Sequence, residues 1–273
     1  MTREVDLQDG RAARAATLAG ATGSGVKSAD RTIDVLELLA GAPRRLTLSE
    51  IHRALGVPKS SLYNLLQTLV ARSWLETDDR NSTYAVGLRA LRVGAAYLER
   101  DPIIEAAGPL LVQLRNDLNE TVHLARLDGA DIVYLASRES AHHLRSSSRI
   151  GRRLPAHATA LGKVLLGSRT DDAVKALLPD HLPALTPETV QDFDTLLAEL
   201  NQARRDGYSY EQGQNTPGLG CFAVAVPGRQ PAVDSLSCSV PLIRLTEEHR
   251  SQIVSALVQA ADELGHLTRR QSW

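Results

Sequence analysis

The chain has 273 residues, a formal net charge of −1 and 43% hydrophobic residues. This length fits one large domain or two ordinary ones, and the apolar content is ample for a folded core. Because the chain has no overall basic excess, nucleic-acid binding would require a local patch of positive charge.

The N-terminal segment 1–26 is rich in Ala, Gly, Thr and charged residues, and we expect it to be a flexible arm. It lacks the apolar core of a signal peptide, and no apolar run in the chain approaches the length of a transmembrane helix. The two cysteines, Cys221 and Cys238, are too few for a disulfide scaffold. These features predict a cytoplasmic protein that does not bind a membrane.

Residues 27–86 are predicted to form three short helices and a hairpin. The first helix, 28–40, has an expected inner face of Ala29, Ile33, Leu36 and Ala40. The second, 47–56, begins with Thr47 and Glu50 at capping-box spacing and ends at Gly56. The third lies in GVPKSSLYNLLQTL and carries a buried stripe of Leu62, Leu65, Leu66, Leu69 and Val70. Strand-type segments 73–77 and 82–86 complete the order of a winged helix-turn-helix.

The polar face of the third helix favours DNA binding over the alternative of a helical bundle for protein docking. Hydroxyl and amino groups suit phosphate oxygens, while Asn and Gln can pair with adenine edges. We predict that this face meets the major groove through Ser60, Ser61, Tyr63, Asn64 and Gln67. Phosphate or wing contacts are predicted for Lys59, Arg44, Arg45 and Arg80.

Residues 87–101 are predicted to be a linker helix with an apolar edge of Leu88, Leu91, Ala95 and Leu98, which can also pack against a second copy of the chain. A second domain is predicted over 102–273. It begins with an amphipathic helix, followed by strands around the Asp-Gly turn of 120–139. Further expected elements are a strand at 142–148, a loop that leads into a helix over 151–168, and helices at 171–178 and 188–206. Strands at 208–214, 221–228 and 232–240 and a helix at 246–267 follow. This alternation indicates an α+β fold with a mainly antiparallel sheet.

Common catalytic motifs do not fit the sequence. ATALGKVLL contains Gly-Lys, but Val164 and His157 stand where a P-loop needs a hydroxyl residue and a glycine. Neither a G-x-S-x-G elbow nor an H-E-x-x-H helix occurs, and the His and Cys spacing matches no common zinc site. We therefore expect no cofactor or metal, and keep a small-molecule enzyme with a helical docking domain as the rival interpretation.

Several ordered segments resemble the IclR family of bacterial transcriptional regulators over residues 28 to about 268. They are RTIDVLELLAGAPRRLTLSEIHRALGVPKSSLYNLLQTLVARSWLE, YAVGLRALRVG, NETVHLARLDGADIVYL, GRRLPAHATALGKVLL, GYSYEQGQNTPGLGCFAVAVPG and SLSCSVP. Each is weak by itself, whereas their order and spacing together are specific.

The resemblance implies a regulator that binds a palindromic operator as a dimer or a dimer of dimers. It also implies a GAF-like effector domain that binds a small carboxylate, for which an aromatic acid and a catabolic intermediate are the two classes we consider. The family's effector positions fall here on Leu144, Ser147, Ala160, Leu161, Glu211, Cys221, Ser237 and Ser239. For Glu211 an exposed strand carboxylate, and for Cys221 plain core packing, remain equal alternatives. Asn64 stands where the family often has Arg, so a relative's operator sequence is not carried over.

Overall fold

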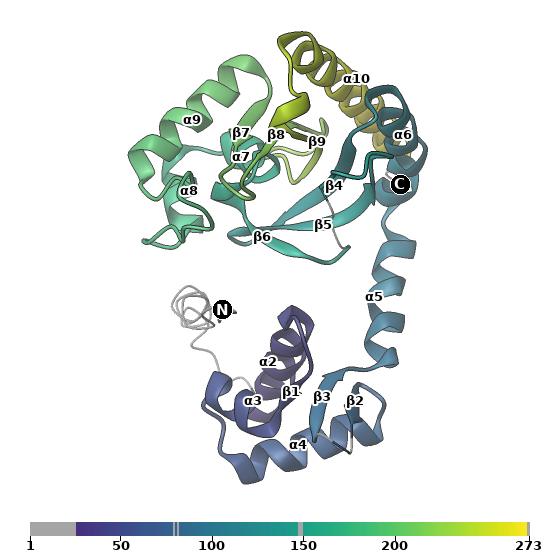
Figure 1. Cartoon of the computed structure of the whole chain (residues 1–273), viewed down its shortest axis with the longest axis vertical. Helices are drawn as coiled ribbons and strands as arrows, with labels where there is room; N and C mark the ends of the chain where they lie inside the picture. Colours follow the sequence, from purple (N-terminus) through teal and green to yellow (C-terminus); the bar gives the residue numbers. More distant parts are fainter. Residues whose placement is uncertain (1–25, 79, 81, 147–149, 272–273) are drawn as a thin grey trace. The chain divides into compact units, whose positions relative to one another are not determined.

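Figure 1 shows the computed structural model, which describes residues 26–78, 80, 82–146 and 150–271. The expected arm at 1–26 lies outside the described residues except for Val26. The described chain divides into two compact units, one ending at Arg100 and the other beginning at Asp101. No helix in these described ranges has both the length and the apolar character needed to cross a membrane.

The N-terminal unit is a winged helix-turn-helix. Its elements are α2 (Lys27–Gly41), β1 (Leu46–Thr47), α3 (Leu48–Leu55), α4 (Lys59–Ala71), β2 (Leu75–Asp78), β3 (Thr83–Val86) and α5 (Leu88–Arg100). The predicted hairpin β2–β3 is confirmed, and β1 joins it as a third antiparallel strand in the order β1-β3-β2. The sequence analysis did not predict β1, because a strand of two residues is too short to show an alternating pattern.

The helix-turn-helix is fixed locally by caps that the sequence predicts. The Thr47 N–H donates to Glu50 Oε2 at 2.8 Å and the Glu50 N–H donates to Thr47 Oγ1 at 3.3 Å, which is a complete capping box. Gly56 adopts φ +68° after α3, a left-handed conformation that most residues avoid. Both caps confirm the expected start and end of this helix.

The expected inner face of α2 is wrong except for Leu36, which is half-buried and packs against the core. Val35 and Leu39 are buried, whereas Ile33 is 55% exposed and Ala40 is exposed. Ile33 and Ala40 lie at the spacing of a helix face, and so do Val35 and Leu39. Packing against the rest of the bundle puts Val35 and Leu39 in the core.

Helix α5 buries none of its residues within its own unit. Leu88 and Leu91 are 71% and 68% exposed, and Val93 and Tyr97 also stay exposed. The helix is amphipathic as expected; Leu88 and Leu91 of its apolar edge are exposed, whereas Ala95 and Leu98 are half-buried.

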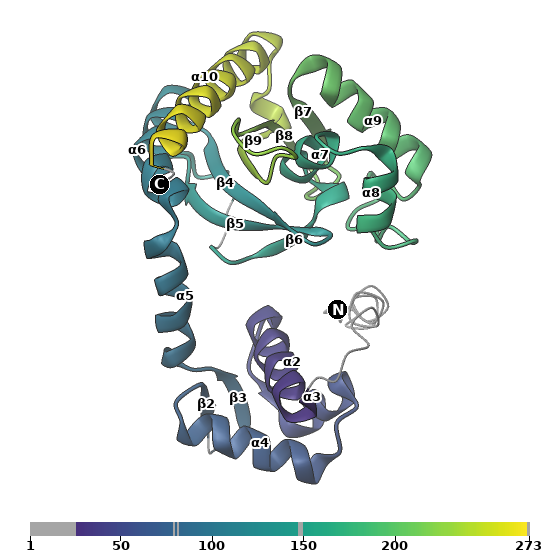
Figure 2. The same cartoon turned by 180° about the vertical axis from the view of Figure 1, so that it is seen from behind.

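The C-terminal unit has three layers (Figures 1 and 2). The described strands pair in the order β6-β5-β4-β9-β8-β7, each pairing antiparallel, which confirms the predicted α+β class. Helices α6 and α10 pack on one face of the sheet, and α7, α8 and α9 contribute to the core on the other. The bounds are α6 (Pro102–Leu118), β4 (Thr121–Asp128), β5 (Asp131–Arg138), β6 (Arg153–Pro155), η1 (Ala156–Ala158), α7 (Ala160–Gly167), α8 (Asp171–Leu177), α9 (Phe193–Asp206), β7 (Ser209–Gln212), β8 (Leu219–Ala225), β9 (Asp234–Pro241), η2 (Leu242–Arg244) and α10 (Glu247–Gln271).

Two expected elements differ from the observed ones. Residues 142–146 form no strand, and 147–148 lie outside the described residues; β6, at Arg153–Pro155, pairs with β5 instead. The helix expected over 188–206 begins only at Phe193, because Asp192 caps it by accepting from the Thr195 N–H at 2.8 Å.

Strand β9 is buried along its whole length, and its side chains alternate between apolar and polar. Leu236, Cys238 and Val240 enter the core under α6 and α10. The residues between them, Ser235, Ser237 and Ser239, therefore face the layer of α7. This face of the sheet is polar although it is buried.

Candidate functional site

Helix α4 separates its two kinds of residue as predicted. Leu62, Leu66 and Leu69 are buried in the core of the N-terminal unit. The opposite face presents exposed polar side chains, namely Lys59, Ser60, Tyr63, Asn64 and Gln67. Ser61 is half-buried, and its hydroxyl donates to the Pro58 carbonyl at 3.0 Å. The helix therefore offers a polar, exposed surface held rigidly by its leucines.

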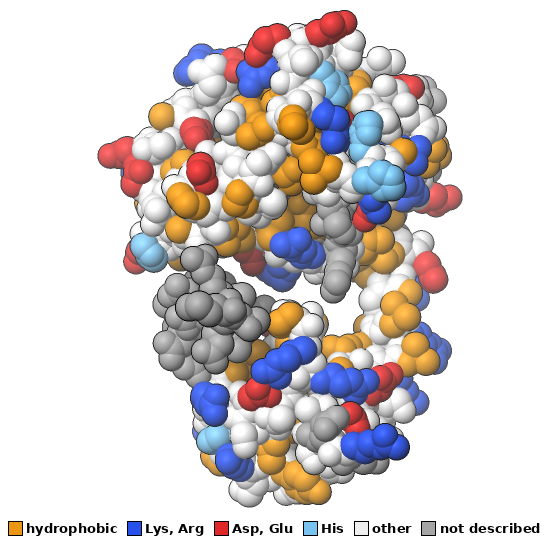
Figure 3. All heavy atoms as spheres, in the orientation of Figure 1, with side chains coloured by type: hydrophobic (Ala, Val, Ile, Leu, Met, Phe, Trp, Pro, Cys, Tyr) orange, Lys and Arg blue, Asp and Glu red, His pale blue; other side chains and the backbone are white. Residues whose placement is uncertain are grey.

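The predicted arginines differ in how they are held. Arg44 forms two hydrogen bonds to Glu50, the shorter at 2.6 Å, and thereby braces the start of α3. Together with the Thr47 contacts, it holds the pKa of the Glu50 carboxyl at about 2. Arg45 forms a surface ion pair with Glu76 at 3.2 Å, and Arg80 is exposed beside the wing turn. Figure 3 shows Lys and Arg side chains, in blue, over the visible face of this unit.

A small pocket lies between the polar face of the sheet and the start of α7. The cavity has a volume of about 10 Å³, roughly the space one water molecule occupies. Its lining comprises Tyr134, Thr159, Ala160, Leu161, Glu211, Asn215, Cys221, Ser237 and Ser239. The structure thus brings together every expected effector residue except Leu144 and Ser147, and adds Tyr134, Thr159 and Asn215.

Strand register assembles the sheet wall of this pocket. Glu211 on β7 pairs with Cys221 on β8, which in turn pairs with Ser239 on β9. Register partners point to the same face, so these side chains form one row across the three strands. Ser237 lies two residues earlier on β9, is 1% exposed, and its Oγ has no hydrogen-bond partner among the described residues.

The opposite wall is the first turn of α7. Thr159 caps the helix by accepting from the Gly162 N–H at 3.0 Å, and the first backbone bond runs from the Lys163 N–H to the Thr159 carbonyl at 2.9 Å. The N–H groups of Ala160 and Leu161 precede that bond, so they are the unpaired donors of this helix end. With the helix dipole they favour an anion in the pocket.

Glu211 is held by a buried polar network that the sequence did not reveal. It is 2% exposed, and one of its oxygens accepts from the Gln214 N–H at 2.8 Å. The Gln214 side chain contacts both Lys163 and Glu199, and Lys163 is 1% exposed in an ion pair with Glu199. Burial raises the pKa of Glu211 and lowers that of Lys163. The interpretation of Glu211 as an exposed carboxylate is therefore wrong.

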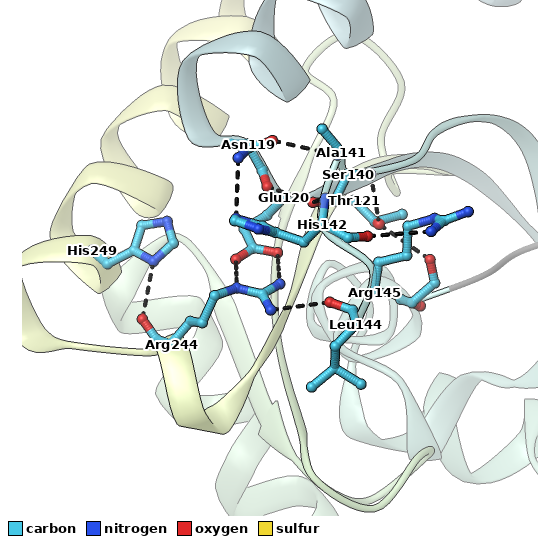
Figure 4. Close-up of polar contacts among 11 residues, drawn as sticks. Asn119, Glu120, Thr121, Ser140, Ala141, His142, Leu144, Arg145, Arg244 and His249 are labelled. Carbon is cyan, nitrogen blue, oxygen red and sulfur yellow. Dashed lines mark hydrogen bonds and ion pairs between the residues drawn. The ribbon is translucent and has the colours of Figure 1, made fainter.

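Leu144 is not part of this pocket. Its side chain is 62% exposed, and its carbonyl accepts from Arg244 Nη1 at 3.0 Å (Figure 4). Arg244 also binds Glu120 through two hydrogen bonds of 2.7 and 2.6 Å, and this pair fixes the chain that follows β5. The family resemblance placed Leu144 in the pocket wall; residues 142–146 form no strand, and the side chain is exposed to solvent. Ser147 lies outside the described residues.

Comparison with known proteins places these two units in one family. The family model of the IclR helix-turn-helix domain matches residues 28–79, and that of the bacterial transcriptional regulator IclR C-terminal region matches residues 95–266. The chain belongs to the IclR family of bacterial transcriptional regulators. It is thus a DNA-binding transcriptional regulator with a C-terminal ligand-binding domain, in a family of regulators rather than enzymes.

Individual members of the IclR family match along nearly the whole chain. The HTH-type transcriptional regulator BhcR of Paracoccus denitrificans is 32% identical over 253 residues, covering 92% of this chain and 90% of BhcR. The crystal structure of an IclR transcriptional regulator from Alicyclobacillus acidocaldarius superposes with a TM-score of 0.79 at 25% identity, covering 89% of this chain and 99% of that one. The crystal structure of an IclR homolog from Microbacterium hydrocarbonoxydans, complexed with 4-hydroxybenzoate, superposes with a TM-score of 0.73 at 24% identity. The match covers 89% of this chain and 99% of that one.

Proposed function

We propose that this regulator binds a palindromic operator as a homodimer or a dimer of dimers, and that a small carboxylate in the pocket changes its affinity for DNA. As a regulator of bacterial transcription it would act in the cytoplasm. The effector would favour one arrangement of the paired DNA-binding units, with α5 joining the sensor to the reader.

The buried hydroxyl of Ser237 carries the effector half of this proposal. A hydroxyl that is 1% exposed and unpaired costs roughly 1–3 kcal/mol. A ligand that enters the pocket can remove this cost by pairing with Ser237 Oγ. The N–H groups of Ala160 and Leu161 across the cavity favour a negatively charged ligand, and a carboxylate has the geometry to accept from both.

The size of the cavity bears on how the effector enters. About 10 Å³ accommodates one water molecule and not a whole organic acid. Binding therefore requires the walls to separate, and that movement offers a route from ligand to structural change. The IclR homolog complexed with 4-hydroxybenzoate supports an acid as the ligand class.

The exposed face of α4 carries the DNA half of the proposal. Asn64 and Gln67 can pair with base edges, while Lys59, Arg45 and Arg80 suit phosphates or the wing's groove. In a dimer, two such helices read half-sites about one or two helical turns apart, at roughly 10 bp per turn.

The apolar edge of α5 supports a homodimer. Leu88 and Leu91 are exposed, and an apolar edge of this kind is best covered by the same edge of a second copy.

Two measurements test the proposal. A mobility-shift assay with the DNA upstream of the gene should show binding that weakens steeply with salt, whereas a protein-docking adaptor would show no such affinity. A thermal-shift screen of small organic acids should then find a stabilising ligand, by about 2.7 kcal/mol at 100 times its Kd. An acid that stabilises the protein yet leaves operator binding unchanged would contradict the proposed coupling.

A further inference from the structure

Two hydroxyl groups of the pocket have no hydrogen-bond partner within the described part of the chain. They belong to Tyr134 and Ser237. Asn215 is only half-buried, so that solvent can satisfy its amide group. The remaining polar side chains of the lining are hydrogen-bonded, namely those of Thr159, Glu211, Cys221 and Ser239. The two hydroxyls are therefore the buried polar groups that a ligand can still satisfy.

Tyr134 is held firmly at its backbone, which makes its unpaired hydroxyl unusual. Its N–H donates to the Arg152 carbonyl at 3.1 Å, and its own carbonyl accepts from the Gly151 N–H at 2.8 Å. The residue is 7% exposed. A buried tyrosine hydroxyl usually has a hydrogen-bond partner, and leaving one without a partner costs free energy. A ligand that accepts from this hydroxyl would remove that cost.

Strand register explains how Tyr134 reaches the pocket. Tyr134 on β5 pairs with Ala125 on β4, which pairs with Ser235 on β9. Both of these neighbours are small, so they leave room for the tyrosine ring on this face of the sheet. The register between β4 and β5 shifts directly beside Ala125, and a bulge of this kind often re-aims a side chain next to a binding site. Tyr134 thereby lines the same cavity as Ser237, although β4 lies between their two strands.

The cavity that Tyr134 and Ser237 line has the size of one oxygen atom with its hydrogens. Its volume is about 10 Å³, roughly that of one water molecule. Burial raises the pKa of Tyr134, so the phenol keeps its hydrogen and can donate it. An oxygen atom in this space can accept from both hydroxyls, whereas a methyl group would leave both of them unpaired.

The two walls of the pocket decide which oxygen of a ligand meets these hydroxyls. The N–H groups of Ala160 and Leu161 belong to the α7 wall, whereas Tyr134 and Ser237 belong to the sheet wall. The lone pairs of a carboxylate point away from its carbon skeleton. A carboxylate that accepts from both N–H groups therefore directs its skeleton towards the sheet wall. The hydroxyls of that wall then meet a substituent on the skeleton and not the carboxylate oxygens.

We propose that Tyr134 is a specificity-determining residue of this pocket. Its hydroxyl and that of Ser237 bind a second oxygen atom of the effector. The pocket therefore prefers a keto or hydroxy acid to the same acid without that oxygen. This assignment rests on the proposed function, because it takes the carboxylate to bind at the start of α7. Leaving a buried hydroxyl unpaired should weaken the binding of the plain acid by about 5- to 150-fold.

The first test needs no ligand. Tyr134→Phe removes only the hydroxyl group from the full-length protein. Because this hydroxyl has no partner in the described fold, the midpoint of urea unfolding should stay the same or rise. A lower midpoint would show that the hydroxyl is bonded within the folded protein, and it would overturn the assignment.

The second test measures selection between acids that differ by one oxygen. The probes are propionate with lactate and pyruvate, and benzoate with 4-hydroxybenzoate, titrated into the full-length protein in a calorimeter. The wild type should prefer the oxygenated acid of a set. Tyr134→Phe should weaken the oxygenated acid by about 5- to 150-fold and leave the plain acid unchanged, which a merely structural role of the hydroxyl would not do. Ser237→Ala should act in the same direction.

The matched control is Tyr210→Phe. It removes the same hydroxyl from the opposite face of the sheet, where Tyr210 packs beside the core under α6 and α10 and donates to Gln212 Oε1 at 3.0 Å. The preference between the acids should not change in this variant. Equal effects of Tyr134→Phe on the plain and the oxygenated acid, or no effect on either, would overturn the role of Tyr134 and leave the carboxylate effector intact. A wild type that binds none of these acids would instead refute the proposed carboxylate effector, and the role of Tyr134 with it.

Discussion

The start of α7 can be tested by adding one methyl group at Gly162. A Cβ built there would lie 2.2 Å from the Ala156 carbonyl oxygen and 2.3 Å from Ala156 Cα, both backbone atoms. Reaching an ordinary contact of 3.4 Å requires a displacement of about 1.2 Å, the difference between 3.4 and 2.2 Å. Overpacking of this kind costs about 1–3 kcal/mol, or more where backbone has to move. Gly162→Ala should therefore destabilise the C-terminal unit and distort the N–H groups beside the pocket.

Gly167→Ala is the matched control in the same helix. Its Cβ would meet nothing closer than 3.6 Å, so the substitution should be neutral or stabilising by roughly 0.5–1 kcal/mol. Urea unfolding followed by circular dichroism should separate the two variants by about 1–4 kcal/mol. Equal unfolding midpoints for the two would show that the contact between η1 and α7 does not fix the pocket wall.

Four further outcomes follow from the two sites. Asn64→Ala should weaken the specific operator more than random DNA, by about 1–3 kcal/mol, and equal losses on both DNAs in a shift assay would remove it from the base-reading set. Ser239→Leu should abolish the effector response in a shift assay and keep operator binding; a normal response would place the pocket elsewhere. Arg45→Ala should lower the slope of log affinity against log salt by about one, whereas an unchanged slope would exclude a phosphate contact. The pKa of Glu50 is about 2 in the folded protein, against an ordinary value of 4.5. Its pairing with Arg44 therefore stabilises the folded state fully above pH 4.5, and this stabilisation is lost as the pH falls towards 2. Acid unfolding of Glu50→Gln should lack that dependence.

Controls for these variants come from exposed positions of the C-terminal unit. Ser251→Leu on α10 repeats the serine-to-leucine change away from the pocket and should leave the effector response unchanged. Arg205→Ala on α9 removes an exposed arginine far along the chain from the DNA-binding unit, and the salt slope should not change. For Glu50, the side chain is 28% exposed and Arg44 is 59% exposed, so solvent screening keeps the pH effect small.

In the N-terminal unit, prediction succeeded where the signal was local. The capping box at Thr47, the left-handed Gly56 and the leucine stripe of α4 each depend on residues within two turns of one another. The inner face of α2 was predicted wrongly because its apolar residues offer two faces. Only packing against the rest of the bundle decides that Val35 and Leu39 enter the core.

The sequence by itself determined the family through its ordered motifs, and most of the elements through periods of 2 and 3.6 and local caps. The resemblance to the family then named six of the nine residues that line the pocket. The tertiary structure decided which side chains meet. Lys163, Gln214 and Glu199 are distant in sequence and form one network, and Tyr134 reaches the pocket only through strand register. The sequence around a carboxyl group on a short strand does not indicate whether that group will be buried. Glu211 is buried because β7 lies under α7 and α9, and that contact exists only once the chain has folded.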